Sequence, residues 1–181
     1  MKERYWKFMY QKMHKITYID LYRERCIWYN RILKCVIALS SSGSVAAWAI
    51  WKNHAFIWGL IVAIGQVINI LYEILPYRSR ITELTALSSK WSVIESKIEH
   101  EWYYIQNDLY DDAKINDLIT QYTQEWSSID DYFLKVESLP LKKNIQKKSE
   151  KNTKAYFENN YIIRKKEDTQ NNHNNNESLV K

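Results

Sequence analysis

The chain has 181 residues, a net charge of +5 and a mean hydropathy of −0.51. This length suits one modest domain, or a small membrane anchor with a helical module, and excludes two full-sized globular domains. Only three Gly and two Pro stand against eight Trp and 14 Tyr, a balance that disfavours hairpin-rich β architecture and predicts an all-α protein.

Residues 1–31 are predicted to form an N-terminal helix. Its apolar side chains repeat at intervals of three and four residues: Trp6, Met9, Met13, Ile16 and Ile19. One apolar face of this kind can pack against later helices and complete a small bundle. The first 30 residues carry charges throughout, so we expect no cleavable signal peptide.

Two apolar segments follow, separated by the short polar turn at 52–54. The first reads CVIALSSSGSVAAWAIW over 35–51 and is lengthened to Ile32, because Arg31 and Lys34 can keep their charges at lipid headgroups. The second reads AFIWGLIVAIGQVINILYEIL over 55–75. At about 1.5 Å per residue, both can cross the hydrocarbon layer. We predict a transmembrane hairpin over 32–75, with spans at about 32–51 and 55–75. A hairpin buried in a soluble bundle is the alternative.

Positive charge is unequally distributed around this hairpin. Lys and Arg residues flank its two outer ends, at Arg23, Arg25, Arg31, Lys34, Arg78, Arg80 and Lys90, whereas the turn holds only Lys52. The positive-inside rule therefore places both termini in the cytoplasm and the turn outside. Tryptophans and tyrosines near both boundaries fit two interfacial belts.

Polar residues interrupt both apolar segments. Gln66, Asn69 and Glu73 share one face of the second, and Ser40 and Ser44 belong to a serine-rich stretch of the first. Two interpretations stay open. These side chains form hydrogen bonds between helices, or they line an aqueous lumen shared by several copies.

Residues 76–139 are predicted to form a cytoplasmic helical hairpin. Apolar residues mark the first helix at Leu84, Leu87, Trp91, Ile94, Ile98 and Ile105, and the second at Ile115, Leu118, Tyr122, Trp126, Ile129 and Phe133. Asp111 and Asp112 mark the break between them. The spacing predicts a helical bundle or a coiled coil, and leaves open whether one chain or several subunits close the core.

The segment 140–181 is basic and rich in Asn, and we predict that it is disordered because it has too few apolar residues to fold alone. Its basic part, LKKNIQKKSEKNTK, either stays solvated or lies on anionic lipid.

Catalytic and metal-binding patterns are not apparent. Cys26 and Cys35 form no CxxC motif, the four histidines are scattered, and neither a phosphate-binding loop nor a nucleophile elbow occurs. We therefore expect no enzyme activity, no cofactor and no metal. The basic residues are not interleaved with base-stacking aromatics, so we also expect no nucleic-acid partner.

The layout resembles the SLATT family of bacterial conflict-system proteins. The likeness covers roughly residues 5–135 and rests on RCIWYNRILK, the tight hairpin, YEILPYRSR, WSVIE and EWYYI. The resemblance implies a multi-pass protein of the bacterial inner membrane that forms a homo-oligomer, perforates the membrane and kills the infected cell. It also implies a partner encoded nearby, such as a second-messenger synthase, a nucleotide sensor or a reverse transcriptase. A non-conducting membrane scaffold or regulator, which binds a partner through its cytoplasmic helices, is the alternative.

Overall fold

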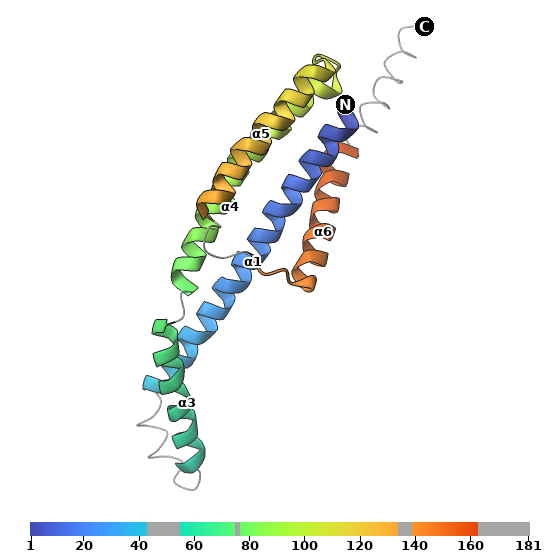
Figure 1. Ribbon diagram of the computed structural model, residues 1–181. Helices are drawn as coiled ribbons and strands as arrows, with labels where there is room; N and C mark the ends of the chain where they lie inside the picture. Colours follow the sequence, from blue (N-terminus) through green and yellow to red (C-terminus); the bar gives the residue numbers. More distant parts are fainter. Residues whose placement is uncertain (43–54, 75–76, 134–138, 163–181) are drawn as a thin grey trace, which may run out of the picture. The chain divides into compact units, whose positions relative to one another are not determined.

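The computed structural model of the chain describes residues 1–42, 55–74, 77–133 and 139–162. They form five α-helices and a short π-helix (Figure 1): α1 (Lys2–Ser42), α3 (Ala55–Ile74), α4 (Tyr77–Gln106), α5 (Asp112–Phe133), α6 (Lys143–Phe157) and η2 (Glu158–Ile162). No strand occurs among the residues that the structure describes. The prediction of an all-α protein is confirmed to this extent.

The chain divides into two compact units. Unit 1 comprises Met1–Leu21 and Leu87–Lys181, and unit 2 comprises Tyr22–Ala86. The segment boundaries predicted after residues 31, 75 and 139 stay predictions. Helix α1 runs through residue 31 without a break, since no Gly or Pro occurs between residues 2 and 42 to interrupt it.

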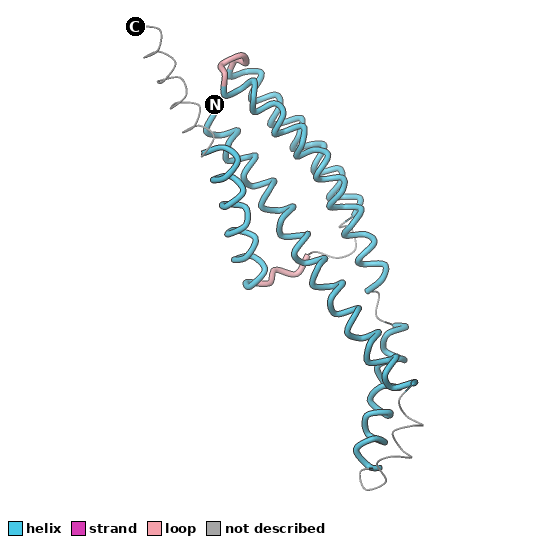
Figure 2. The backbone as a smooth tube through the Cα atoms, turned by 180° about the vertical axis from the view of Figure 1, so that it is seen from behind, coloured by secondary structure: helices cyan, strands magenta, loops and turns pink. Residues whose placement is uncertain are grey.

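The core of unit 1 contains most of the apolar positions predicted for it, although Trp6, Met13, Ile129 and Phe133 are only partly covered. Its buried side chains include Met9, Ile16, Ile19, Leu87, Trp91, Ile94, Ile98, Ile105, Ile115, Leu118, Tyr122 and Trp126. The rings of Trp91 and Trp126 stack with centroids 4.5 Å apart, and α4 and α5 lie side by side in both views (Figures 1 and 2). These side chains are buried in a single copy, so unit 1 closes its core without a second subunit.

Helix α1 joins this core through Tyr5. The Tyr5 hydroxyl donates a hydrogen bond to the carbonyl oxygen of Ile98, at 3.0 Å, and its ring stacks on that of Trp102 with centroids 6.3 Å apart. Lys12 places its ammonium 4.4 Å from the ring centroid of Trp126, in a cation–π contact. The N-terminal helix therefore contacts both α4 and α5.

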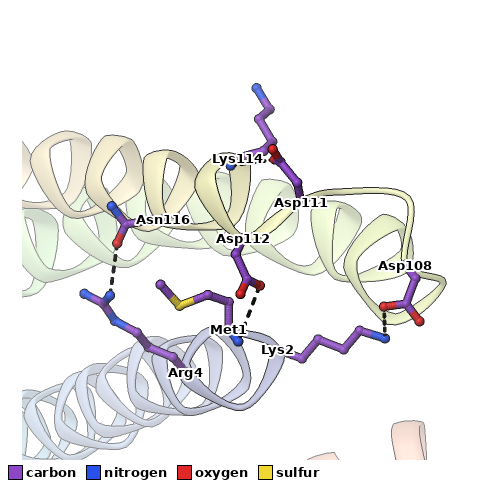
Figure 3. A network of polar contacts seen from close by, with 8 residues as sticks. All are labelled: Met1, Lys2, Arg4, Asp108, Asp111, Asp112, Lys114 and Asn116. Carbon is purple, nitrogen blue, oxygen red and sulfur yellow. Dashed lines mark hydrogen bonds and ion pairs between the residues drawn. The ribbon is translucent and has the colours of Figure 1, made fainter.

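The turn between α4 and α5 also holds the start of α1 (Figure 3). Asp108 adopts a φ of 57°, a left-handed conformation that Asp tolerates better than most residues and that closes the end of α4. Its carboxylate lies 2.6 Å from the Lys2 ammonium, and the N-terminal amine lies 3.6 Å from Asp112. Asp111 caps α5 by accepting a hydrogen bond from the backbone N–H of Lys114.

Residues 143–162 correct the prediction of a disordered tail from residue 140. Helix α6 buries Ile145, Ser149, Thr153 and Phe157, which repeat every four residues and form one face. The Ser149 hydroxyl donates to the His14 carbonyl oxygen at 2.9 Å. The segment folds on α1 because hydroxyl groups supply contacts that a count of apolar residues overlooks. Residues 163–181 of the predicted tail lie outside the described residues.

Glu99 of α4 contacts two tyrosines, Tyr156 in α6 and Tyr161 in η2. Glu99 Oε1 accepts hydrogen bonds from the hydroxyls of Tyr156, at 2.7 Å, and Tyr161, at 2.6 Å. Glu95, one turn earlier, is buried, and this burial together with the neighbouring Glu99 raises the pKa of Glu95 to about 8. Burial and the nearby Glu99 carboxyl thus both favour the protonated form of Glu95 at neutral pH.

This carboxyl pair predicts a pH dependence of stability. Because its pKa is higher in the folded chain than in the unfolded chain, Glu95 favours folding at low pH and loses that contribution between about pH 4.5 and about pH 8. In E95Q the ionisation is absent, so the variant should gain on the order of 4 kcal/mol relative to the parent between pH 5 and pH 8.5. Urea unfolding in non-ionic detergent, followed by circular dichroism, measures this difference.

The matched control is E150Q, at an exposed glutamate of α6. Its stability relative to the parent should be the same at both pH values. A pH-independent effect of E95Q would contradict the buried-proton account.

Candidate functional site: an exposed apolar surface on α3

Helix α3 has one covered face within unit 2. Among the side chains that the structure describes, its partly or fully covered residues are Val62, Gly65, Ile68 and Tyr72, which lie three or four residues apart and so share a face. The Tyr72 hydroxyl donates a hydrogen bond to Asn30 Oδ1 of α1 at 2.9 Å. This face is therefore directed toward the part of α1 that belongs to unit 2.

The rest of α3 presents apolar side chains to the outside. Eight large ones are exposed by 43% to 85%: Phe56, Ile57, Leu60, Ile61, Ile64, Val67, Ile70 and Leu71. Glu73 is the one ionisable residue in the 20-residue sequence of α3. Helix α1 adds exposed apolar and aromatic side chains to unit 2, at Ile27, Trp28, Tyr29 and Ile32. Water-exposed helices normally carry charges on this side, so the surface indicates contact with an apolar partner.

The predicted polar residues Gln66 and Asn69 lie at or beside the covered face of α3. At about 100° per residue, Asn69 is about 40° and Gln66 about 100° around the helix from Gly65. Both side chains are exposed, and neither has a hydrogen-bond partner among the described residues. Gln66 therefore lies beside the covered face, whereas Asn69 falls within its arc, between Gly65 and Val62, which is about 60° from Gly65.

The other three candidates are placed less completely. Ser40 belongs to α1 and Glu73 to α3, but their side chains are not among those that the structure describes, and Ser44 lies outside the described residues.

Within the described ranges, no helix combines the length and the apolar character that a membrane span requires. The predicted spans 32–51 and 55–75 include residues 43–51 and 75, which lie outside those ranges, as does the predicted turn. The same described ranges contain no group of three or more His, Cys, Asp or Glu side chains placed to hold a metal ion.

Two features of unit 1 were not predicted from the sequence. One is the contact of Glu99 with Tyr156 and Tyr161, which joins residues 57 and 62 positions apart. The spacing of Glu95 and Glu99 by one helical turn was visible, but nothing in the sequence linked it to the tail. The other is the fixed orientation of the lysines on α6.

No protein-family model matches the sequence, and neither the curated proteins nor the solved structures give a significant match. The resemblance to the SLATT family accordingly stays a prediction from the sequence segments quoted above.

The exposed apolar surface of α3 predicts that the chain partitions into the membrane fraction and not into the aqueous wash. Lysine in the middle of an apolar membrane segment costs about 2.5–3.5 kcal/mol, so I64K/V67K should release most of the chain from the membrane fraction during alkaline carbonate washing. The control T82K/T85K adds the same charge at exposed threonines of α4 and should stay in the pellet. Equal retention of both variants would show that the α3 surface does not hold the chain on lipid.

Proposed function

We propose that the chain inserts residues 32–75 into the bacterial inner membrane as a helical hairpin and acts there as a pore-forming effector. In this proposal several copies assemble and permeabilise the membrane of an infected cell, within an antiphage or abortive-infection system. Both termini remain in the cytoplasm. The observation that carries the proposal is the apolar surface of α3, together with the exposed side chains of Gln66 and Asn69.

The energetics of that surface support insertion. Fully burying one large aliphatic or aromatic side chain is worth about 1.5–3 kcal/mol, and α3 leaves eight such side chains exposed. Lipid removes all of them from water together. A soluble chain would need a partner along the whole helix to obtain the same gain.

The polar residues support assembly. In hydrocarbon, an amide side chain needs a hydrogen-bonding partner. Gln66 and Asn69 have none among the described residues of their own chain. Neighbouring copies, or water in a shared lumen, would supply those partners.

A non-conducting membrane scaffold or regulator is the second candidate. Unit 1 favours it, because its core is closed within one chain and its outer surface is free to bind another protein. The trigger of an effector would act through the same surface. By the SLATT resemblance, we propose a second-messenger synthase, a nucleotide sensor or a reverse transcriptase as the partner that supplies the signal.

Replacing Gln66 and Asn69 by Leu separates the two functions. Q66L/N69L makes the helix more apolar and should preserve insertion, while it removes the hydrophilic path that ions require. We expect unchanged membrane content, intact crosslinked oligomers and loss of ion leakage, measured together after induced expression. T82L/T85L, with the same substitution at exposed positions of α4, should leak like the parent.

The other outcomes are equally distinct. Unchanged leakage with intact oligomers would exclude these two residues from the pore lining. Loss of the oligomers would assign them to contacts between subunits. A parent chain that inserts and assembles but never dissipates the membrane potential, even with its partner, would favour the scaffold.

A further inference from the structure

Helix α6 is held on unit 1 at both ends. Before it begins, the Tyr18 hydroxyl donates to the Pro140 carbonyl oxygen at 2.6 Å and accepts from the backbone N–H of Lys142 at 3.0 Å. At its end, the ring of Phe157 meets that of Trp6 edge-on, with centroids 5.0 Å apart. Together with the two tyrosine hydroxyls on Glu99, these contacts fix which face of α6 turns outward.

The outward face carries lysines. Six of them are exposed between residues 142 and 158: Lys142, Lys143, Lys147, Lys148, Lys151 and Lys154. The same stretch holds two glutamates, Glu150 and Glu158, which leaves a net charge of +4. Lys154 lies 3.8 Å from Glu158.

Three of these lysines form a row. Lys143, Lys147 and Lys151 repeat every four residues and therefore share a side of the helix, on a different side from the buried residues Ile145 and Ser149. None of the three has an acidic partner among the residues that the structure describes. We call the row together with Lys148 the lysine face.

The residue composition of the lysine face indicates the chemical class of its binding partner. No arginine or aromatic residue occurs between residues 142 and 154. The face therefore lacks the guanidinium groups and aromatic rings with which proteins recognise nucleic-acid bases. Ammonium groups spread along a helix instead match a surface of many phosphates. The apolar side chains Ile145 and Phe157 are buried in unit 1, so α6 has no apolar face left to insert as interfacial helices do.

We propose that the lysine face of α6 binds the headgroups of anionic phospholipids by charge alone, as a second membrane contact besides the hairpin. This inference rests on the proposed function, because the hairpin brings the chain to the membrane. Each lysine near an anionic surface contributes about a fivefold factor in binding. The contact should weaken at high salt, because such charges are screened within about 10 Å.

Lysine footprinting of the full chain tests this contact. The chain is placed in nanodiscs of neutral phosphatidylcholine, or of phosphatidylcholine with phosphatidylglycerol, and treated with an amine-acylating reagent before mass spectrometry. Lys143, Lys147 and Lys151 should react severalfold more slowly in the anionic discs, and high salt should restore their reactivity. The exposed lysines Lys7 and Lys114 should react equally in both.

Two triple variants each remove three positive charges, one from the lysine face and one from exposed lysines elsewhere in unit 1. In K143Q/K147Q/K151Q, the lipid-dependent protection of Lys148 should fall. In K7Q/K15Q/K114Q, which changes exposed lysines of α1 and α5, the protection of Lys148 should persist. Equal loss in both variants would show an effect of net charge only and would overturn the proposal.

Two further outcomes overturn it as well. One is the absence of any difference between neutral and anionic discs. The other is protection of the same lysines by added single-stranded RNA but not by anionic lipid, which would assign the face to nucleic acid. If the chain does not enter nanodiscs, the hairpin proposal fails, and the same footprint in solution with vesicles of the two compositions still decides the role of the lysine face.

Discussion

The uncovered apolar side of α3 is the constraint on which this account of the chain depends. Its eight exposed apolar side chains favour removal from water, because a contiguous apolar surface promotes aggregation. Only one face of α3, marked by Gly65 and Tyr72, is covered within the described part of the chain. In the proposed membrane hairpin, lipid would surround the remaining side and neighbouring copies would meet Gln66 and Asn69, which would satisfy both the apolar and the polar demands.

Unit 1 obeys a different constraint, because it obtains its stability from its own chain. The stacked Trp91 and Trp126, the bond from Tyr5 to α4 and the ion pairs at the α4–α5 turn make a closed bundle. The exposed ion pairs add little to stability. They join the N-terminal end of α1 to the turn between α4 and α5. A closed bundle can present α6 in a fixed orientation, which is what gives its lysines a common side.

Much of the bundle was predictable, since Trp91, Ile98 and Trp126 follow helical spacing and are buried. The fold of residues 143–162 was not, because the buried face of α6 includes Ser149 and Thr153, which periodicity treats as solvent-facing. The sequence placed Gln66 and Asn69 on one face of a helix. The rotation of α3 against α1, which leaves both exposed, depends on contacts such as that of Tyr72 with Asn30.

Thiol labelling in intact cells tests the membrane hairpin most directly. With Cys26 and Cys35 replaced by Ala, an impermeant maleimide should label N53C, in the predicted outer turn, without permeabilisation. It should label N152C, on an exposed position of α6, only after the inner membrane is opened, because the proposed topology places both termini in the cytoplasm. Labelling of N152C in intact cells, or protection of N53C until the membrane is opened, would contradict the account.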